Sequence, residues 1–210
     1  GHSNAEYDKL FEESGVLREK TWQEFLDTSL ALGNCPPLRG DNVVIITNGG
    51  GAGLLAADHF ERLGMPLKEL KDISPDLREN IRNYMPAFGS PLNPVDISGT
   101  ATSDMYGGAL KTAYRDEHVD GILISVCPTA VTDVEAITET VINIHRQYKN
   151  LGKPFIMECQ GGNECREAIM KLRDKGIPAY STPEQAVNAM VALRRYSHIM
   201  NKKEKLIKNI

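Results

Sequence analysis

The chain has 210 residues, of which 41% are hydrophobic and 25% are charged, and its formal net charge at pH 7 is -4. This balance is typical of a globular protein with one ordinary domain plus extensions, and the slight acidity argues against a nucleic-acid-binding fold. No apolar run approaches the roughly 18 residues of a membrane span and no signal peptide is evident, so we expect a cytoplasmic protein that binds neither nucleic acid nor membrane.

The chain is expected to begin with an expression scar, residues 1–5 ("GHSNA"), so His2 is excluded from any mechanism. Residues 6–40 predict a helical extension and a linker. The first helix is expected to stop at Gly15, and the second to begin at Thr21, with Glu24 as its capping-box partner. The two helices are expected to carry apolar stripes formed by Tyr7, Leu10, Phe11 and Val16, and by Phe25, Leu26, Leu30 and Leu32.

Residues 41–198 show short apolar runs that alternate with longer amphipathic ones. Strands are expected at 43–47, 95–97, 121–126, 154–158 and 178–180, with a weak edge strand at 66–70; helices are expected at 52–63, 75–84, 103–115, 133–149, 163–175 and 183–197. Near-continuous apolar strands separated by helices predict an α/β domain with a doubly wound, mostly parallel sheet, either flavodoxin-like or Rossmann-like. A basic tail, residues 199–210, is expected to be a solvated, frayed helix end.

Capping residues support these helices. Ser74, Thr132 and Thr182 are expected as N-caps, two of them followed by proline at the first helical position. Gly64 and Gly176 lie where glycines commonly end helices.

The cysteines do not predict a metal site. Cys35, Cys127, Cys159 and Cys165 show no C-x-x-C spacing, so reduced thiols are expected and neither zinc nor another metal is.

The sequence "TNGGGAG", residues 47–53, joins a strand to a helix, and three interpretations are open. Residues 51–56, which begin in it, fit a G-x-G-x-x-A pattern, which suggests a dinucleotide, although the strand before the acids Glu69 and Asp72 is poor. The glycines also suit a tight turn that needs close packing. The favoured interpretation is a phosphate-like or acyl group at a helix N-terminus. The candidate ligand or interface residues are Asn48, Gly49, Gly50, Gly51 and Gly53.

Three further loops follow strands, where open α/β sheets bind their ligands. "CPTAVTD", residues 127–133, can direct the amides of Thr129, Ala130, Val131, Thr132 and Asp133 at an anion. "QGGNE", residues 160–164, adds Gly161 and Gly162. A plain capped helix and an ordinary turn remain the alternatives for these two loops. In the fourth, "NPVDISGTATSD", Asp96 is expected to orient backbone amides instead of acting in catalysis.

No catalytic set is apparent. His59, His118 and His145 are expected at surface or boundary positions, and neither a Ser-His-Asp order nor a G-x-S-x-G sequence is present. Several anion-binding loops without a nucleophile suggest an accessory part of a composite active site.

Five ordered motifs across residues 6–197 carry a family resemblance: "VVIITNGGGAGLLAAD", "NPVDISGTA", "VDGILISVCPTAVTD", "KPFIMECQGG" and "GIPAYSTPEQAVNAM". Together they resemble the ligase-CoA domain of the NDP-forming acyl-CoA synthetases, in particular ADP-forming acetyl-CoA synthetase. They are also similar to the carboxy-terminal domain of the succinyl-CoA synthetase β subunit.

The resemblance implies the reaction acyl-CoA + ADP + phosphate to acid + ATP + CoA, through a phosphohistidine stabilised by helix N-termini. By position, "CPTAVTD" would supply one of these. The full enzyme would use CoA, ADP or ATP and Mg²⁺, and this part would bind none of them alone. Its partners would be the CoA-binding, phosphohistidine-bearing and ATP-grasp domains or subunits, in a hetero-oligomer or homodimer.

One departure keeps other functions open. The family carries its histidine in an S-H-T-G-type motif before the position of Tyr7, but only "GHSNAE" precedes Tyr7 here. This part alone is therefore expected to be catalytically silent. The alternatives are an acyl-CoA-sensing regulatory domain of a synthetase-like protein fused to an acetyltransferase, and an independent dinucleotide-binding domain.

Overall fold

The computed structural model describes residues 3–208, with side chains described as far as Lys203, so His2 lies outside the described residues. Its centre is a six-stranded sheet in the order β2-β3-β1-β4-β5-β6. The parallel strands are β1 (Val43–Thr47), β3 (Val95–Asp96), β4 (Gly121–Val126), β5 (Phe155–Cys159) and β6 (Ala179–Tyr180), and β2 (Ser90–Pro91) is antiparallel to β3. Counted along the chain, the parallel strands lie in the order 2-1-3-4-5, which is flavodoxin-like.

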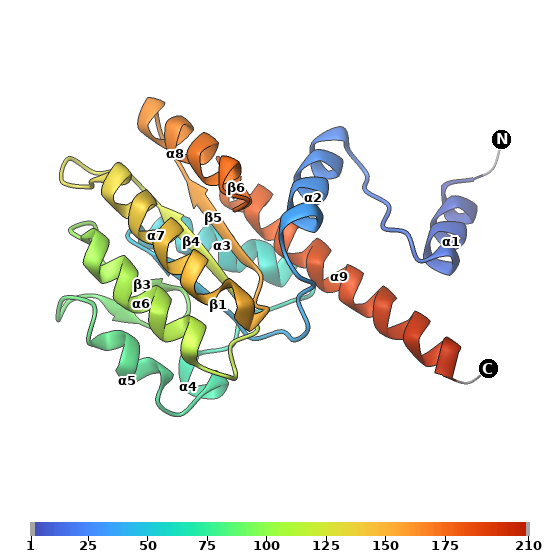
Figure 1. Cartoon of the computed structure of the whole chain (residues 1–210), viewed down its shortest axis with the longest axis horizontal. Coiled ribbons are helices and arrows are strands. Elements are labelled where there is room, and N and C mark those ends of the chain that lie inside the picture. The colour runs from blue at the N-terminus through green and yellow to red at the C-terminus, as the bar shows by residue number, and fades with distance from the viewer. Residues whose placement is uncertain (1–2, 209–210) are drawn as a thin grey trace.

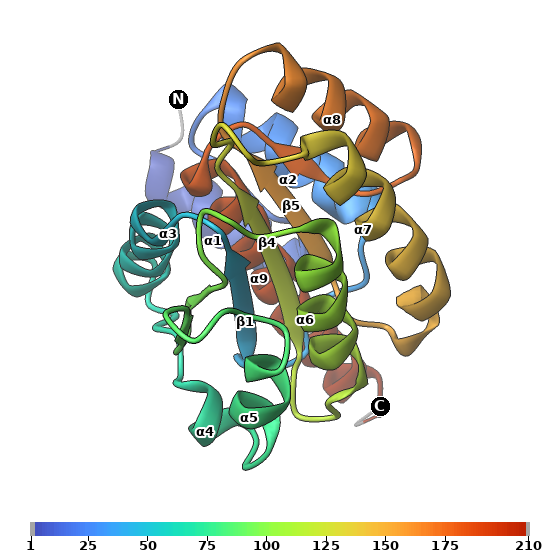
Figure 2. The same cartoon turned by 90° about the vertical axis from the view of Figure 1, so that its left-hand side faces the viewer.

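Helices cover both faces of the sheet (Figures 1 and 2). One face packs against α4 (Leu70–Ile73), α5 (Leu77–Arg82), α6 (Ser103–Arg115), α7 (Val134–Tyr148) and α8 (Asn163–Asp174), and the other against α2 (Trp22–Asn34), α3 (Gly50–Arg62) and α9 (Pro183–Lys208). A 3-10 turn, η1 (Lys149–Leu151), follows α7. Residues of β1, β4 and β5 are fully buried between the two layers, which confirms the doubly wound prediction.

The sheet has a switch point between β1 and β4. These strands are neighbours, paired from Val43 with Gly121 to Thr47 with Ser125. The helix after β1, α3, packs on one face, whereas the helix after β4, α7, packs on the other. The two connections therefore diverge above the carboxyl ends of these strands, which is where folds of this type bind ligands.

The segment near residue 70 differs from the prediction. The expected strand at 66–70 is absent, because Leu70 and Ile73 form a short helix whose two apolar side chains are buried in the core. The edge position is taken by β2, which the sequence analysis missed. Ser74 ends α4 through its N–H, which donates to the Leu70 carbonyl over 3.0 Å, so the prediction of Ser74 as an N-cap is wrong.

The amino-terminal helices have their predicted caps but only part of their predicted packing. Gly15 ends α1 (Asn4–Ser14) in the left-handed conformation, and Thr21 and Glu24 form the expected capping box. The apolar stripe predicted for α2 is only partly right: Leu30 and Leu32 pack against the core, but Phe25 and Leu26 do not. The buried side chains of this helix are Asp27, Thr28 and Ala31. Residues 3–5 belong to the capped first helix. That residues 1–5 are an expression scar stays a prediction.

Polar contacts explain the orientation of α2. The Tyr180 hydroxyl donates to the Asp27 carbonyl over 2.7 Å, and the Gln185 amide donates to both Asp27 carboxylate oxygens. These bonds anchor the helix by its polar side, and leave Phe25 and Leu26 about half exposed at 50% and 45%.

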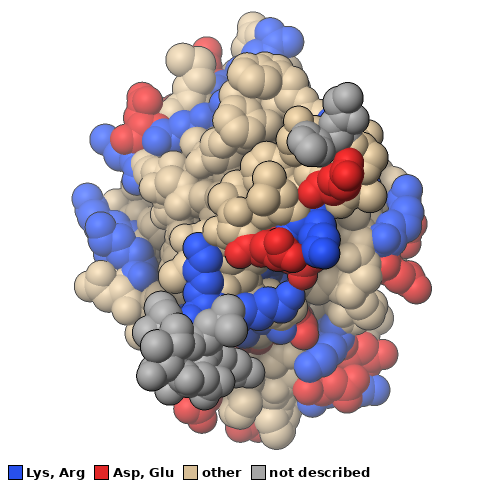
Figure 3. Space-filling view, turned by 90° about the vertical axis from the view of Figure 1, so that its right-hand side faces the viewer, with Lys and Arg blue, Asp and Glu red and all other residues tan. Residues whose placement is uncertain are grey.

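The last helix, α9, is longer than predicted and continues to Lys208. Its end lies beside α1 (Figure 1), where Lys202 pairs with Glu12 at 2.8 Å. Figure 3 shows basic and acidic side chains interleaved on this face. Over the described residues, the tail therefore continues a structured helix; residues 209–210 lie outside the described part. None of the described helices is long and apolar enough to span a membrane.

Candidate functional site

The candidate site is the carboxyl edge of the sheet. There β1, β3, β4 and β5 lead through short loops into the N-termini of α3, α6, α7 and α8. The loops before α6 and α7 project at the left of Figure 1 and face the viewer in Figure 2. Because the first amides of a helix have no partner within it and the helix dipole is positive there, this edge favours anions.

The glycine-rich loop is tighter than expected. Gly49 is the N-cap and α3 already begins at Gly50, two residues before the predicted start. A Cβ atom at Gly49 would lie 2.6 Å from the Cys127 sulfur, one at Gly50 would lie 2.7 Å from Asp96 Oδ2, and one at Gly53 would lie 2.9 Å from Pro94. These three glycines therefore serve close packing. A Cβ at Gly51 would meet nothing within 4 Å, so Gly51 alone presents an open backbone.

This difference predicts opposite effects for two alanine substitutions. We expect Gly49→Ala to destabilise the fold by about 1–3 kcal/mol, because the new methyl group overpacks against Cys127. We expect Gly51→Ala to be neutral or to stabilise it by up to about 1 kcal/mol, because alanine favours an exposed helical position. Urea denaturation of both variants checks the prediction, and equal midpoints would contradict it.

Asn48 joins the two loops at the switch point. It is only 3% exposed. Its Nδ2 donates to the Cys127 carbonyl over 2.9 Å, and its Oδ1 accepts from the Cys127 N–H at 2.8 Å and from the Tyr106 hydroxyl at 3.0 Å. The side-chain amide is therefore occupied by the fold, and in this structure Asn48 positions the loops.

The loop at 127–133 is closed by its own threonines. The Thr129 N–H donates to Thr132 Oγ1 over 2.9 Å, and the Val131 N–H donates to Thr129 Oγ1 over 3.3 Å. The predicted cap at Thr132 is wrong: Asp133 caps α7 by accepting from the Ala136 N–H at 2.9 Å, because the Thr132 hydroxyl is already bonded within the loop.

Only some of the predicted phosphate-facing residues, 129–133, have a backbone N–H that is not already hydrogen-bonded. The Thr132 N–H donates to the Thr129 carbonyl over 3.1 Å. Within residues 3–208, the N–H groups of Ala130 and Asp133 make no hydrogen bond. Ala130 is exposed, and the neighbouring Thr129 hydroxyl donates to the Gly99 carbonyl over 3.0 Å, which ties this loop to the one before α6.

The far side of α7 is unfavourable to anions. A groove of about 660 Å³ lies between the first turns of α7 and α8. Ala130, Val131 and Thr132 line its rim, and its charged lining consists of Asp133, Glu135, Glu164, Glu167 and Lys171. The lysine is already paired with Glu139 and lies 3.7 Å from Glu135. Four carboxylates against one paired lysine disfavour an anion in this groove, so we expect an anion to approach from the side of Gly51 and Gly99, which do not line it.

The loop at 160–164 contains the clearest disagreement with the sequence analysis. Cys159 and Cys165 form a disulfide across it, so the prediction of four reduced thiols is wrong for this pair, whereas Cys35 and Cys127 are free. The reason is local: the strand end and the first helical turn face each other with a Cα–Cα distance of 5.3 Å. Gly162 is the N-cap of α8 and has open space around it.

Asp96 has the predicted structural role. Its Oδ1 accepts from the Ser98 N–H at 2.8 Å, in a turn where Ser98 has a positive φ of 79°. The carboxylate therefore fixes the loop that carries Gly99.

Glu158, which was not predicted as a site residue, lies fully buried on β5. It stands in a polar row across the sheet, in register with Ser125 on β4 and Tyr180 on β6. Neither of its carboxylate oxygens has a hydrogen-bond partner among the described residues. Burial raises the pKa of Glu158 to about 7, and Ser125 and Gln160, which face it, offset part of the rise. A carboxylate in an otherwise apolar strand was the signal in the sequence.

The histidines among residues 3–208 lie away from this edge. His145 is near the end of α7, where burial lowers its pKa to about 4 and the Tyr114 hydroxyl lies 2.8 Å from its Nδ1. His59 contacts Asn188 at 2.8 Å, and His118 lies near Asp116 before β4. Among the described residues there is also no group of three or more His, Cys, Asp or Glu that suits a metal ion.

Comparison with known proteins identifies the family. The model of the ligase-CoA domain matches residues 43–202, which is most of the chain. The chain belongs to the ligase-CoA domain family. The match includes all four loops of the candidate edge, and it confirms the resemblance derived from the five motifs.

Relatives of this ligase-CoA domain are parts of larger enzymes. It is 42% identical over 201 residues to the alpha subunit of an ADP-forming acetate–CoA ligase I from Pyrococcus furiosus. The alignment covers 93% of this chain and 41% of that protein. It is 28% identical over 152 residues to the beta subunit of a GDP-forming succinate–CoA ligase from Thermus thermophilus, covering 72% of this chain and 33% of that one.

A solved structure is also similar. The dinucleotide-forming acetyl-coenzyme A synthetase 1 of Ca. Korarchaeum cryptofilum, in complex with phosphate and ADP, matches with a TM-score of 0.90 and 33% identity over 98% of this chain and 43% of that one. The ligase-CoA domain described here thus spans less than half the length of these relatives. None of the similarities supports the acetyltransferase-linked sensor or the independent dinucleotide-binding domain.

Proposed function

We propose that this chain is the ligase-CoA part of an ADP-forming acyl-CoA synthetase, which converts acyl-CoA, ADP and phosphate into the acid, ATP and CoA. Its role is to stabilise a phosphoryl group presented by another part of the enzyme. The observation that carries the proposal is the switch point itself, where the free amide of Ala130 and the open first turn of α3 at Gly51 follow two neighbouring parallel strands.

The chemistry of this edge fits a phosphoryl group. The described loops offer backbone N–H donors and two helix dipoles, which stabilise negative charge without a side-chain cation. The described residues at this edge include no histidine, so the group that carries the phosphate belongs elsewhere in the enzyme. Asn48, Thr129 and Asp96 hold the loops in place, so the donors are fixed before the phosphate arrives.

The remaining parts of the reaction are proposed for other domains or subunits. CoA, ADP or ATP and Mg²⁺ would bind in CoA-binding and ATP-grasp parts, and the phosphohistidine would lie on a third. The P. furiosus relative is named as an alpha subunit, which supports an assembly of several chains or domains. We propose a cytoplasmic location for it. The acyl group and the choice of nucleotide belong to those other parts.

Reconstitution tests this proposal. We expect this chain alone to make no ATP from acetyl-CoA, ADP and phosphate, and the complete synthetase assembled with it to do so in the presence of Mg²⁺. Luciferase detection of ATP measures the result, and an assembly without this chain is the control. ATP formation that is equal with and without this chain would contradict the proposal.

A further inference from the structure

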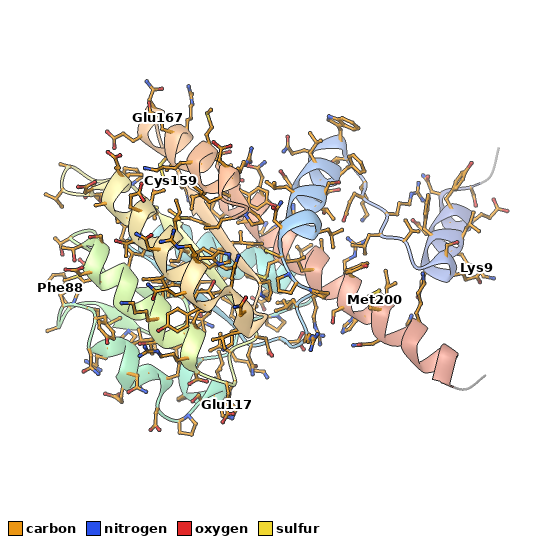
Figure 4. The ribbon with its side chains drawn as sticks, in the orientation of Figure 1. Lys9, Phe88, Glu117, Cys159, Glu167 and Met200 are labelled. Carbon is orange, nitrogen blue, oxygen red and sulfur yellow. A yellow bond between two sulfur atoms is a disulfide. The ribbon has the colours of Figure 1, made fainter. Side chains whose placement is uncertain are left out.

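The Cys159–Cys165 disulfide closes the third loop of the candidate edge. Cys159 ends β5, and Cys165 lies in the first turn of α8; Figure 4 labels Cys159 near the end of its strand, beside α8. Both residues are buried, at 0% and 1% exposure. Between them, residues 161–164 are all exposed, so the bridge encloses a short segment of surface loop.

The position of α8 does not depend on this bridge. Its inner face buries Ala168, Ile169 and Leu172 in the core. The strand end is held separately, because the Gln160 N–H donates to the Val126 carbonyl over 3.0 Å. The bridge therefore restricts mainly the loop with Gly161 and Gly162. Because glycine has the widest choice of backbone conformations, this loop gains the most freedom when the disulfide opens.

The loop transmits this restriction to the 127–133 segment. A Cβ atom at Gly161 would lie 3.3 Å from Pro128 Cγ and 3.4 Å from the Cys165 sulfur. The exposed Gly161 backbone therefore lies beside both the disulfide and Pro128, which precedes the phosphate-facing residues. If the bridge opens, the Gly161 backbone is free to move relative to Pro128.

We propose that Cys159 and Cys165 form a reversible thiol–disulfide site that controls how the carboxyl edge is ordered for its anion. In the oxidised state the two sulfurs are bonded, and the loop is held against Pro128. Reduction by a dithiol adds two electrons and two protons to give two thiols, while the dithiol becomes a cyclic disulfide; a small-molecule disulfide reverses the step. The effect on phosphate rests on the function proposed above, whereas the thiol chemistry does not.

Thiol counting and NMR test the site without any activity. We expect N-ethylmaleimide to label two cysteines of the oxidised, denatured protein, Cys35 and Cys127, and four after dithiothreitol. In the folded protein, reduction should shift the amide resonances of Gly161, Gly162 and Thr129, and leave Gly15 and Gly64 unchanged. Four labels after treatment with oxidised dithiothreitol, or loop resonances that do not move, would overturn the proposal.

The assembled synthetase tests the consequence for the anion. We expect the yield of phosphoenzyme from ATP and Mg²⁺ to fall about 5-fold or more on reduction. The double variant Cys159→Ser/Cys165→Ser should not respond to dithiothreitol, whereas Cys35→Ser should respond like the wild type. If the enzyme is active and gives equal yields in both redox states, the proposed redox control of the carboxyl edge is overturned. If the loop resonances shift but no phosphoenzyme forms in either state, the proposed function is rejected and the thiol site remains supported.

Discussion

Replacing Glu158 with glutamine is expected to stabilise the fold by about 3 kcal/mol at pH 8 and to change little at pH 4.5. The buried carboxyl has a pKa raised to about 7 from the ordinary value of 4.5, mainly by burial. The protonated acid is tolerated inside the protein, but the carboxylate is not, because it has no hydrogen-bond partner among the described residues. Glutamine keeps the shape and cannot ionise.

The direction with pH follows from proton binding. Between pH 4.5 and 7 the unfolded chain releases the Glu158 proton before the folded one does, so the folded state binds more protons and its stability falls as pH rises. The contribution of protonated Glu158 to the stability of the fold is complete below pH 4.5 and is lost as pH rises through 7. Since one pKa unit corresponds to about 1.4 kcal/mol, a shift of this size gives the stated difference.

Urea denaturation at pH 4.5 and pH 8 measures the effect of Glu158→Gln as a change in the free energy of unfolding. Glu167→Gln is the matched control, because Glu167 is exposed on α8, and it should shift stability equally little at both pH values. If Glu158→Gln changed stability by the same amount at both, ionisation of the buried carboxyl would not be the cause.

Replacing Asn48 with alanine is expected to destabilise the fold by about 3 kcal/mol. The substitution removes both bonds to the Cys127 peptide and the acceptor of the Tyr106 hydroxyl. The groups left behind are buried or partly buried, and each unpaired buried group costs about 1–3 kcal/mol. Because these bonds connect the loops after β1 and β4, both loops should lose order together.

Tyr106→Phe provides the comparison for Asn48→Ala. It removes the hydroxyl that reaches Asn48 and the Ser125 carbonyl, but leaves the link between Asn48 and Cys127 intact, so we expect a cost of about 1 kcal/mol. Urea denaturation gives both values, and hydrogen exchange at Gly49 and Thr129 reports loop order. An Asn48→Ala variant as stable as Tyr106→Phe would show that the link between the loops contributes little.

The sequence predicted those features that depend on local patterns. The apolar runs at β1, β4 and β5 indicated strands buried on both sides. Helix caps such as Thr21 and the left-handed glycines at 15, 64 and 176 follow from a few neighbouring residues. Once a parallel sheet was expected, the loops after its strands had to meet at one edge, which located the candidate site.

The features that were missed depend on distant pairs of residues. Asn48 gave no sign of its link to Cys127, because that contact spans 79 positions. The apolar strand around Glu158 was a sign of its burial, but which residues lie beside its carboxyl group is known only from the register with Ser125. The exposed apolar residues of α2 resulted from anchoring by Asp27, Tyr180 and Gln185, which overrode the pattern of the helix itself.

The central claim is that free amides at the switch point stabilise a phosphoryl group. Its most direct test is the yield of acid-labile phosphohistidine in the complete synthetase, after incubation with radiolabelled ATP and Mg²⁺. Ala130→Asp places a carboxylate beside the free N–H, and Leu151→Asp places the same charge at an exposed position beyond the far end of α7. We predict that Ala130→Asp lowers the yield about 10-fold or more and that Leu151→Asp leaves it unchanged; equal yields from the two variants would contradict the account.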